Sequence, residues 1–193
     1  MDATKLQVKV FASAHDGLTP EAFIPIFHEW IKNHVLADLM IDVANYAHVP
    51  KGPGVVLIGH NYDTFIDESE GRFGVLHNRK RGTPPPGERL TDAVRRALHT
   101  ASLLEAEPAL AGKLRFSTGE VLVRVNDRLA APNTDATYAA LAPEIEALGT
   151  KLFAGPVTLR RAGDAKSLFG VTVTGTPGSD LASLLGRLGG APS

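Results

Sequence analysis

The residues best suited to chemistry lie in one stretch, "GPGVVLIGHNYDTFIDESEGRFGVLHNRKRG", which runs from Gly52 to Gly82. His60, Asp63 and Asp67 follow one another there at intervals of three and four residues. Imidazole nitrogens and carboxylate oxygens bind divalent cations, so these three side chains form a candidate metal site. Because an imidazole titrates near pH ~6.5, His60 is also a candidate general base, with Asp63 and His77 as further candidate catalytic groups.

The same stretch also fits a structural role. Its apolar runs, one before and one after the charged segment, are typical of two strands joined by a loop with a solvated tip. Lysine and arginine in "HNRKR" are a common means of keeping sheet edges apart, although Arg79 can also bind a phosphate or carboxylate. The sequence favours the solvated hairpin and leaves a site around residues 48–80 as the alternative.

Other candidate ligand-binding residues stand beside turns and strand ends. His48 precedes the proline- and glycine-rich "VPKGPG", which is long enough to form the wall of a pocket. Tyr62 follows the end of an apolar strand, where side chains often converge on a cleft. Asp127 and Arg128 end another predicted strand, just before a capped helix. Since aspartate is also an ordinary turn residue, a structural role competes with ligand binding there.

The C-terminal segment differs from the rest of the chain. Residues 1–174 are predicted to form one domain, and residues 175–193 contain a Gly/Pro/Ser linker and a short amphipathic stretch. The apolar positions of this stretch are Leu181, Leu184, Leu185 and Leu188. A helix this short is marginal in water on its own, so it is expected to dock on its own domain or on a partner. The four leucines are therefore candidate partner-binding residues.

The predicted elements that position these residues alternate helices with pairs of strands. A first strand, "LQVKVFA", precedes three helical segments, and each helix is followed by strands, in the order β, then α-ββ units. "KLRFSTGEVLVRV" is predicted to be a hairpin that turns at Ser117, Thr118 and Gly119. Short connections favour an α+β fold with a mixed, mostly antiparallel sheet of hairpins and three helices packed on it. The first βαββ segment also fits a split βαβ unit of the ferredoxin-like kind.

Composition limits the classes of function. The chain has 193 residues, 44% hydrophobic and 21% charged, with a formal net charge of −1, as in a soluble globular domain. This balance disfavours nucleic-acid binding through a broad basic face. With no cysteine there is no disulfide, no thiolate metal site and no cysteine nucleophile. No signal-peptide pattern and no apolar run of ~18 residues is present, so a cytoplasmic protein without membrane contact is expected.

The usual catalytic and nucleotide-binding motifs are absent from the sequence, and nothing in it identifies a cofactor. The sequence therefore favours a non-catalytic binding or interaction module that engages a partner protein or a small ligand and self-associates. The alternative is a small-molecule enzyme that performs metal-assisted hydrolysis or acid–base chemistry around residues 48–80.

Overall fold

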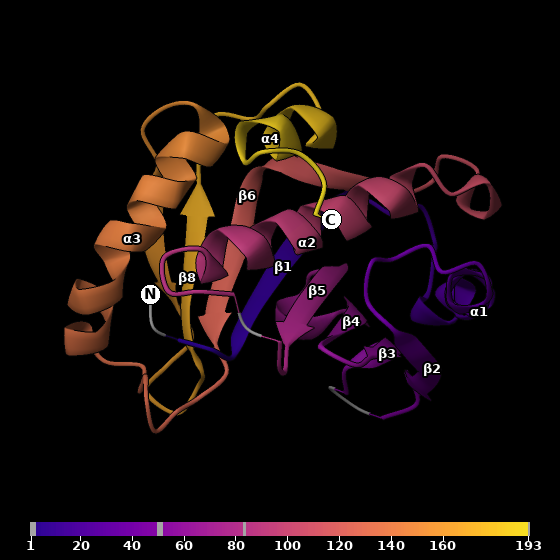
Figure 1. Ribbon diagram of the computed structural model, residues 1–193, viewed down its shortest axis with the longest axis horizontal. Helices are drawn as coiled ribbons and strands as arrows, with labels where there is room; N and C mark the ends of the chain where they lie inside the picture. The colour runs from indigo at the N-terminus through magenta and orange to yellow at the C-terminus, as the bar shows by residue number, and fades with distance from the viewer. Residues whose placement is uncertain (1–2, 50–51, 83, 193) are drawn as a thin grey trace.

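The computed structural model describes residues 3–49, 52–82 and 84–192 (Figure 1). Pro50 and Lys51, in the turn predicted after His48, lie outside these ranges. The strands are β1 (Leu6–Ala14), β2 (Met40–Tyr46), β3 (Gly54–Gly59), β4 (Tyr62–Asp67), β5 (Gly74–Arg79), β6 (Arg115–Val125), β7 (Thr158–Ala162) and β8 (Phe169–Thr174). The α-helices are α1 (Ile24–Lys32), α2 (Arg89–Glu105), α3 (Asp135–Phe153) and α4 (Leu181–Arg187), and short 3₁₀ turns form η1 (Pro20–Phe23), η2 (Ser69–Gly71) and η3 (Pro108–Leu110).

The eight strands form one sheet in the order β2-β3-β4-β5-β1-β6-β8-β7, and neighbouring strands are antiparallel throughout. The predicted α+β class and antiparallel sheet are confirmed, with four α-helices in place of the expected three. A split βαβ arrangement does occur, but in the second half of the chain. There α3 connects β6 to β7 and β8 lies between them, whereas three strands separate β1 from β2.

Two predictions about single strands were wrong. The segment read as a charged loop after His60 contains the strand β4, which pairs with both β3 and β5. Its aromatic, β-branched and acidic residues alternate as in a strand with one polar face. The acidic residues made the segment look like a loop in the sequence. The hairpin predicted around Gly119 is one continuous strand, β6, whose register against β1 shifts after Val10. Such a shift marks a bulge, which "FSTGE" produces in place of a turn.

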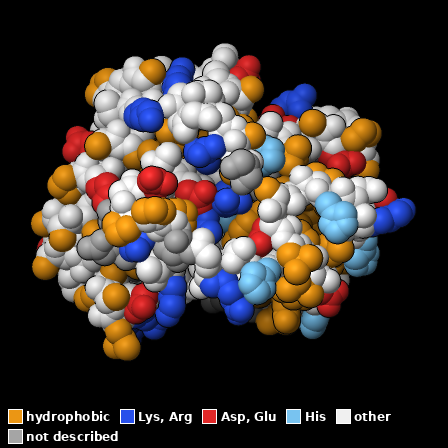
Figure 2. Space-filling model, in the orientation of Figure 1, with side chains coloured by type: hydrophobic (Ala, Val, Ile, Leu, Met, Phe, Trp, Pro, Cys, Tyr) orange, Lys and Arg blue, Asp and Glu red, His pale blue; other side chains and the backbone are white. Residues whose placement is uncertain are grey.

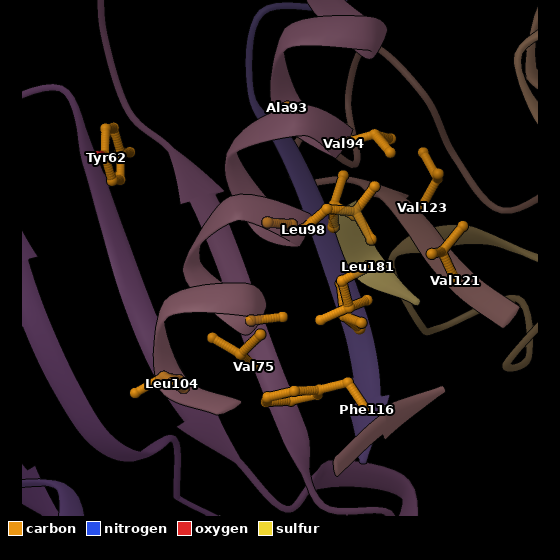
Figure 3. Packing of buried hydrophobic residues seen from close by; sticks show 14 of the residues in the cluster. Tyr62, Val75, Ala93, Val94, Leu98, Leu104, Phe116, Val121, Val123 and Leu181 are labelled. Atoms are coloured by element: carbon orange, nitrogen blue, oxygen red, sulfur yellow. The ribbon is translucent and has the colours of Figure 1, made fainter. Parts of the chain in front are cut away.

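All four helices lie on one face of the sheet, with α2 crossing β1 and β5 (Figure 1). The strands follow period-2 alternation, so Val8 and Val10 of β1 point toward this face. Val94 and Leu98 of α2 pack over the neighbouring strands, next to valines of β6 (Figure 3). Each of these side chains is at most 2% exposed, so the apolar stripe of α2 and the inner face of the sheet form the main core.

The C-terminal segment belongs to this core. Asp180 caps α4 by accepting a hydrogen bond from the Ser183 amide, and the helix packs on α2, α3 and β6. The four leucines proposed to bind a partner are 0–7% exposed: Leu181, Leu184, Leu185 and Leu188. Partner binding through these residues stays a prediction, and it would require α4 to leave the domain. Among the described residues, none of the helices has the length and apolar character needed to cross a membrane.

Candidate functional site

The polar residues of the 52–82 stretch are divided between the two faces of the sheet. Successive residues of β4 point to opposite sides, so Tyr62 lies on the helix-covered face and Asp63 on the other. Tyr62 is directly opposite Arg79 of β5, and Thr64 is opposite His77. Three of the sequence-predicted site residues, Tyr62, His77 and Arg79, therefore come together under α2. The same alternation separates them from Asp63 and Asp67.

A buried polar cluster forms where β4 and β5 meet α2. The rings of Tyr62 and His77 have centroids 4.5 Å apart, and the guanidinium of Arg96 lies 5.4 Å from the centre of the Tyr62 ring. Asp92 accepts hydrogen bonds from both Arg79 and Arg96. Sequence analysis did not identify Asp92 and Arg96 as site residues. Their spacing of four residues on one helix face was the available signal.

His77 is held neutral inside this cluster. Burial lowers the pKa of His77 well below its ordinary value, and the nearby Arg79 and Arg96 lower it further. Burial also raises the pKa of Tyr62. Neither imidazole nitrogen of His77 has a hydrogen-bond partner within the described part of the chain, and the side chain is 0% exposed. A base with no exposed surface has no route to a substrate proton, which favours a structural role for His77.

The candidate metal ligands do not converge. His60 is exposed in the turn between β3 and β4. Asp63 forms an ion pair with Lys80 at 2.6 Å, and Asp67 forms one with Lys9 at 2.5 Å. Within residues 3–49, 52–82 and 84–192, no three histidine, aspartate or glutamate side chains are placed to hold a metal ion. The geometry gives the predicted metal site no support.

The remaining candidates lie apart from the buried cluster. His48 is exposed after β2. Histidine side chains gather on the half of the molecule that contains α1 and β2 (Figure 2). Asp127 accepts hydrogen bonds from the Leu129 and Ala130 amides, and these bonds, led by the one from Ala130, lower its pKa. His60 and Asp127 do end parallel strands at the same end of the sheet. However, three strands separate β3 from β6, a distance of about 19 Å.

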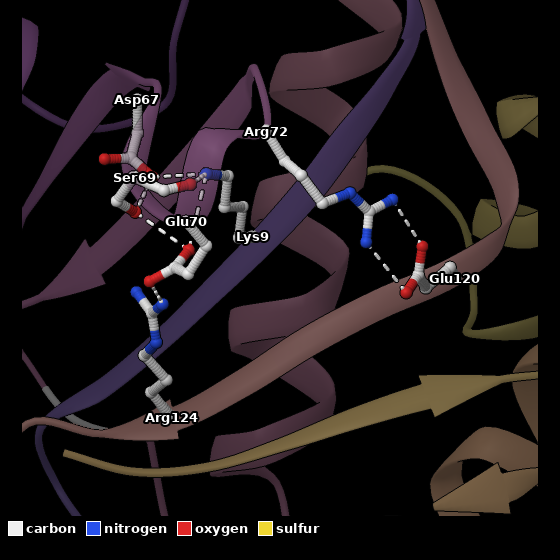
Figure 4. Close-up of polar contacts among 7 residues, drawn as sticks. All are labelled: Lys9, Asp67, Ser69, Glu70, Arg72, Glu120 and Arg124. Carbon is white, nitrogen blue, oxygen red and sulfur yellow. Dashed lines mark hydrogen bonds and ion pairs between the residues drawn. The ribbon is translucent and has the colours of Figure 1, made fainter. Parts of the chain in front are cut away.

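The face without helices in the described structure carries a network of charges around a buried lysine (Figure 4). Lys9 of β1 is 0% exposed, and its ammonium donates to Asp67 at 2.5 Å and to the Ser69 carbonyl at 3.0 Å. Desolvation lowers the pKa of Lys9, while Asp67 acts in the opposite direction. Turn η2 reaches over the strand here and places Glu70, 3.7 Å from the ammonium, against Arg124 of β6.

A second pair flanks this network. Arg72, just after η2, forms a two-pronged ion pair with Glu120 of β6, with hydrogen bonds of 3.0 and 2.6 Å. Its guanidinium also stacks over the ring of Phe11, 3.6 Å from the centroid. An arginine fixed by a carboxylate and an aromatic ring loses little further freedom when another group contacts it. Phe11 and Arg72 thus form a rigid wall on the uncovered face.

A cavity opens between this wall and β7. Its volume is about 190 Å³, and its lining comprises Phe11, Glu70, Arg72, Leu122, Arg160, Arg161, Ala162, Gly163 and Thr172. A hollow of about 280 Å³ adjoins it and shares Glu70, Ala162 and Gly163. Arg160, Thr172, Leu122 and Lys9 are opposite one another on β7, β8, β6 and β1, so the cavity continues the row that begins at the buried lysine. We call this cavity and its adjoining hollow the arginine pocket.

The charges around the arginine pocket do not cancel. Lys9 pairs with Asp67, Arg124 with Glu70, and Arg72 with Glu120. Arg160 is exposed and forms no ion pair with any carboxylate in the described ranges. Its neighbour Arg161 points to the other side of β7 and pairs with Asp135 of α3. Among the residues that the structure describes, Arg160 in the lining of the pocket is thus left without a counter-charge. No family model, no curated protein and no solved structure matches the chain.

Proposed function

We propose that the protein is a non-catalytic binding module that holds a small organic acid in the arginine pocket. The observation that carries the proposal is the uncompensated guanidinium of Arg160 at a cavity of about 190 Å³. A guanidinium presents N–H groups that match the two oxygens of a carboxylate or phosphate. An acidic group placed there would pair with Arg160 and complete the charge balance of the network.

The apolar lining supports an organic ligand over a bare ion. Leu122 forms part of the lining and is 2% exposed, and the ring of Phe11 closes one side beneath Arg72. A ligand pocket of this kind binds the carbon skeleton through its apolar walls and fixes the orientation through a few polar groups. Besides Arg160, the hydroxyl group of Thr172 is available for this second role.

The proton-transferring groups nearest to the pocket are already engaged, which supports binding without catalysis. Glu70 lies between Lys9 and Arg124, and the ammonium of Lys9 is buried against Asp67. Each group would have to break an ion pair before it could act on a ligand. The alternative expectation was acid–base catalysis around residues 48–80. The fully buried His77 does not support it, because its imidazole has no exposed surface for a substrate to reach.

The proposal is tested by thermal unfolding in the presence of small acids. Separate arms would contain monocarboxylic acids, dicarboxylic acids, phosphate esters and inorganic phosphate. At a concentration of 100 times Kd, the bound ligand should stabilise the protein by about 2.7 kcal/mol, which raises Tm by several degrees.

Two arginine variants localise the effect. Arg160→Gln should abolish the stabilisation. Arg115→Gln should preserve it, because Arg115 is exposed at the start of β6 and lines neither part of the pocket. The proposal fails if none of the acids shifts Tm, or if Arg160→Gln responds like the unmodified chain. A response to inorganic phosphate alone would reject the organic ligand.

A further inference from the structure

The turn between β6 and α3 displays one leucine to solvent. Leu129 is 98% exposed, the highest value among the large hydrophobic side chains described. The turn is held by defined hydrogen bonds: the Asp127 carboxylate accepts from the Leu129 and Ala130 amides at 3.2 and 3.1 Å, and the Asp127 carbonyl accepts from Ala131 at 2.9 Å. Leu129 is thus presented by a fixed backbone, and a backbone ordered in advance loses little entropy on binding.

A hollow lies beside this leucine. It has a volume of about 540 Å³ between the end of β6, the N-terminal segment and the first half of α3. Its lining is dominated by small side chains and includes Ala3, Ala130, Ala131, Ala136, Ala140 and Leu141. Asp127 and Ala130 belong both to the turn and to the lining, so Leu129 stands at the rim of the hollow. An apolar projection and a mostly apolar recess, whose lining also contains the Lys5–Asp127 ion pair, therefore occur on the same surface, which we call the Leu129 surface.

The charges of the Leu129 surface are complementary in the same way. Arg128, next to the projecting leucine, is exposed and forms no ion pair within the described part of the chain. Asp135, next to Ala136 at the recess, has a side chain that is 98% exposed; one of its carboxylate oxygens pairs with Arg161 at 2.5 Å. When a projection and a recess lie on the same patch, a two-fold axis lets the projection of each copy enter the recess of the other.

We propose that the protein forms a two-fold symmetric dimer in which Leu129 of each copy enters the hollow of the other. The same arrangement brings Arg128 toward the partner's Asp135. The partner is thus a second copy of this chain. In this arrangement Arg128 contacts the partner copy and does not bind a small ligand. The Leu129 surface and the arginine pocket share one contact, the ion pair of Asp135 with Arg161, but the insertion of Leu129 into the hollow does not depend on it.

A competing surface surrounds the edge strand β2. The other large hydrophobic side chains that are exposed lie there: Val35, Leu39, Ile41, Tyr46 and Val49. However, the Val43 amide already donates to the Asp42 carboxylate at 2.7 Å. This contact occupies a backbone group that pairing with another strand would need, and a charge on an edge strand opposes such pairing. Association through β2 is therefore the alternative that the test must distinguish.

Sedimentation velocity over a concentration series measures the association. The unmodified chain should dimerise, and Leu129→Asp should weaken the dimer at least tenfold. Ala140→Trp, which fills the recess from within, should have the same effect. Ile41→Asp is the matched control on β2 and should leave the dimer intact. Because Leu129 is almost fully exposed, its replacement should not alter the circular dichroism spectrum.

Cross-linking tests the contact itself. The chain has no cysteine, so Leu129→Cys combined with Ala140→Cys creates the only thiols. Under oxidation this double variant should form a covalent dimer. The proposal is overturned if the unmodified chain is monomeric at all concentrations. It is equally overturned if Ile41→Asp dissociates the dimer while Leu129→Asp does not.

Discussion

Lys9 and His77 are buried on opposite faces of the sheet and in opposite ways. On the uncovered face, Lys9 keeps a charge partner: the side chains of Lys9 and Asp67 are 0% and 5% exposed, and their ammonium and carboxylate are 2.5 Å apart. Under α2, His77 is equally buried, but its ring nitrogens have no partner among the described residues and its pKa is strongly lowered. The Lys9 ammonium keeps its charge because it is paired with Asp67, whereas the His77 imidazole is held neutral. The contribution of Lys9 to the free energy of unfolding should therefore depend on Asp67, and that of His77 should depend on pH.

The largest effect is expected for Lys9→Met. Removing one partner of a buried ion pair leaves the other charge unpaired and costs about 3–5 kcal/mol. The double variant Lys9→Met/Asp67→Leu should recover most of that loss, because no buried charge remains. Urea unfolding measures both. The surface pair Lys32–Glu29, with side chains 71% and 61% exposed, provides the control, and Lys32→Met should cost less than about 0.5 kcal/mol. Equal effects at Lys9 and Lys32 would refute the distinction.

A smaller loss is expected for Asp92→Asn beneath α2. Asp92 holds both Arg79 and Arg96, and the Arg79 side chain is 5% exposed, so the substitution leaves a largely buried guanidinium without its carboxylate. Because the Asp92 side chain is itself 15% exposed, water compensates in part, and a loss of about 3 kcal/mol is expected. A cost below about 1 kcal/mol in urea unfolding would show that Asp92 is dispensable for this cluster.

The third prediction concerns His77 and pH. The unfolded chain binds a proton at His77 below pH ~6.5, whereas the folded chain resists it until its lower pKa is reached. Stability should therefore fall as pH decreases from 6.5, by up to about 1.4 kcal/mol per pH unit, and level off below the folded pKa. His77→Leu should remove this contribution without loss of stability at pH 7.5. His99, whose pKa is also lowered by burial, adds a slope of the same sign.

The comparison fails if the pH slope of stability in His77→Leu is as steep as in the unmodified chain, since His99 alone accounts for only part of it. Unfolding free energies measured at several pH values between 5 and 8 distinguish the two outcomes. A marked loss of stability in His77→Leu at pH 7.5 would mean that the ring nitrogens have partners in solution, since an apolar residue of similar size otherwise fills the site at little cost.

The sequence predicted local features better than distant contacts. The α+β class follows from the short connections between the predicted elements. Tyr62, His77 and Arg79 were candidates from one stretch of the chain, chosen for their residue types and their places beside predicted strands. Lys9 belongs to the predicted strand "LQVKVFA", in which apolar and polar residues alternate, so its side chain is expected on the polar face. It does lie on the uncovered face, but its burial depends on Asp67, which is 58 residues away.

The arginine pocket could not be predicted for the same reason. Arg160, Thr172 and Leu122 become neighbours only through the order β7-β8-β6, which adjacent strands in the chain do not reveal. The position of α4 was likewise undetermined, because its apolar stripe fits its own domain and a partner equally well. The order of the strands and the docking of helices on one face of the sheet depend on which arrangement buries the most apolar surface of the whole chain. No single segment of the sequence determines that arrangement.

The central place of β1 has a consequence for how the chain folds. This strand precedes the other seven along the chain, yet Val8 pairs with His77 on one side and Val123 on the other. The strands β3, β4 and β5 can associate through short turns, while β1 must wait for partners that appear much later. Closing such long loops costs entropy before the contacts compensate, so folding is expected to be slow. During synthesis one edge of β1 can pair once β5 has left the ribosome, while the other edge stays open until β6 follows.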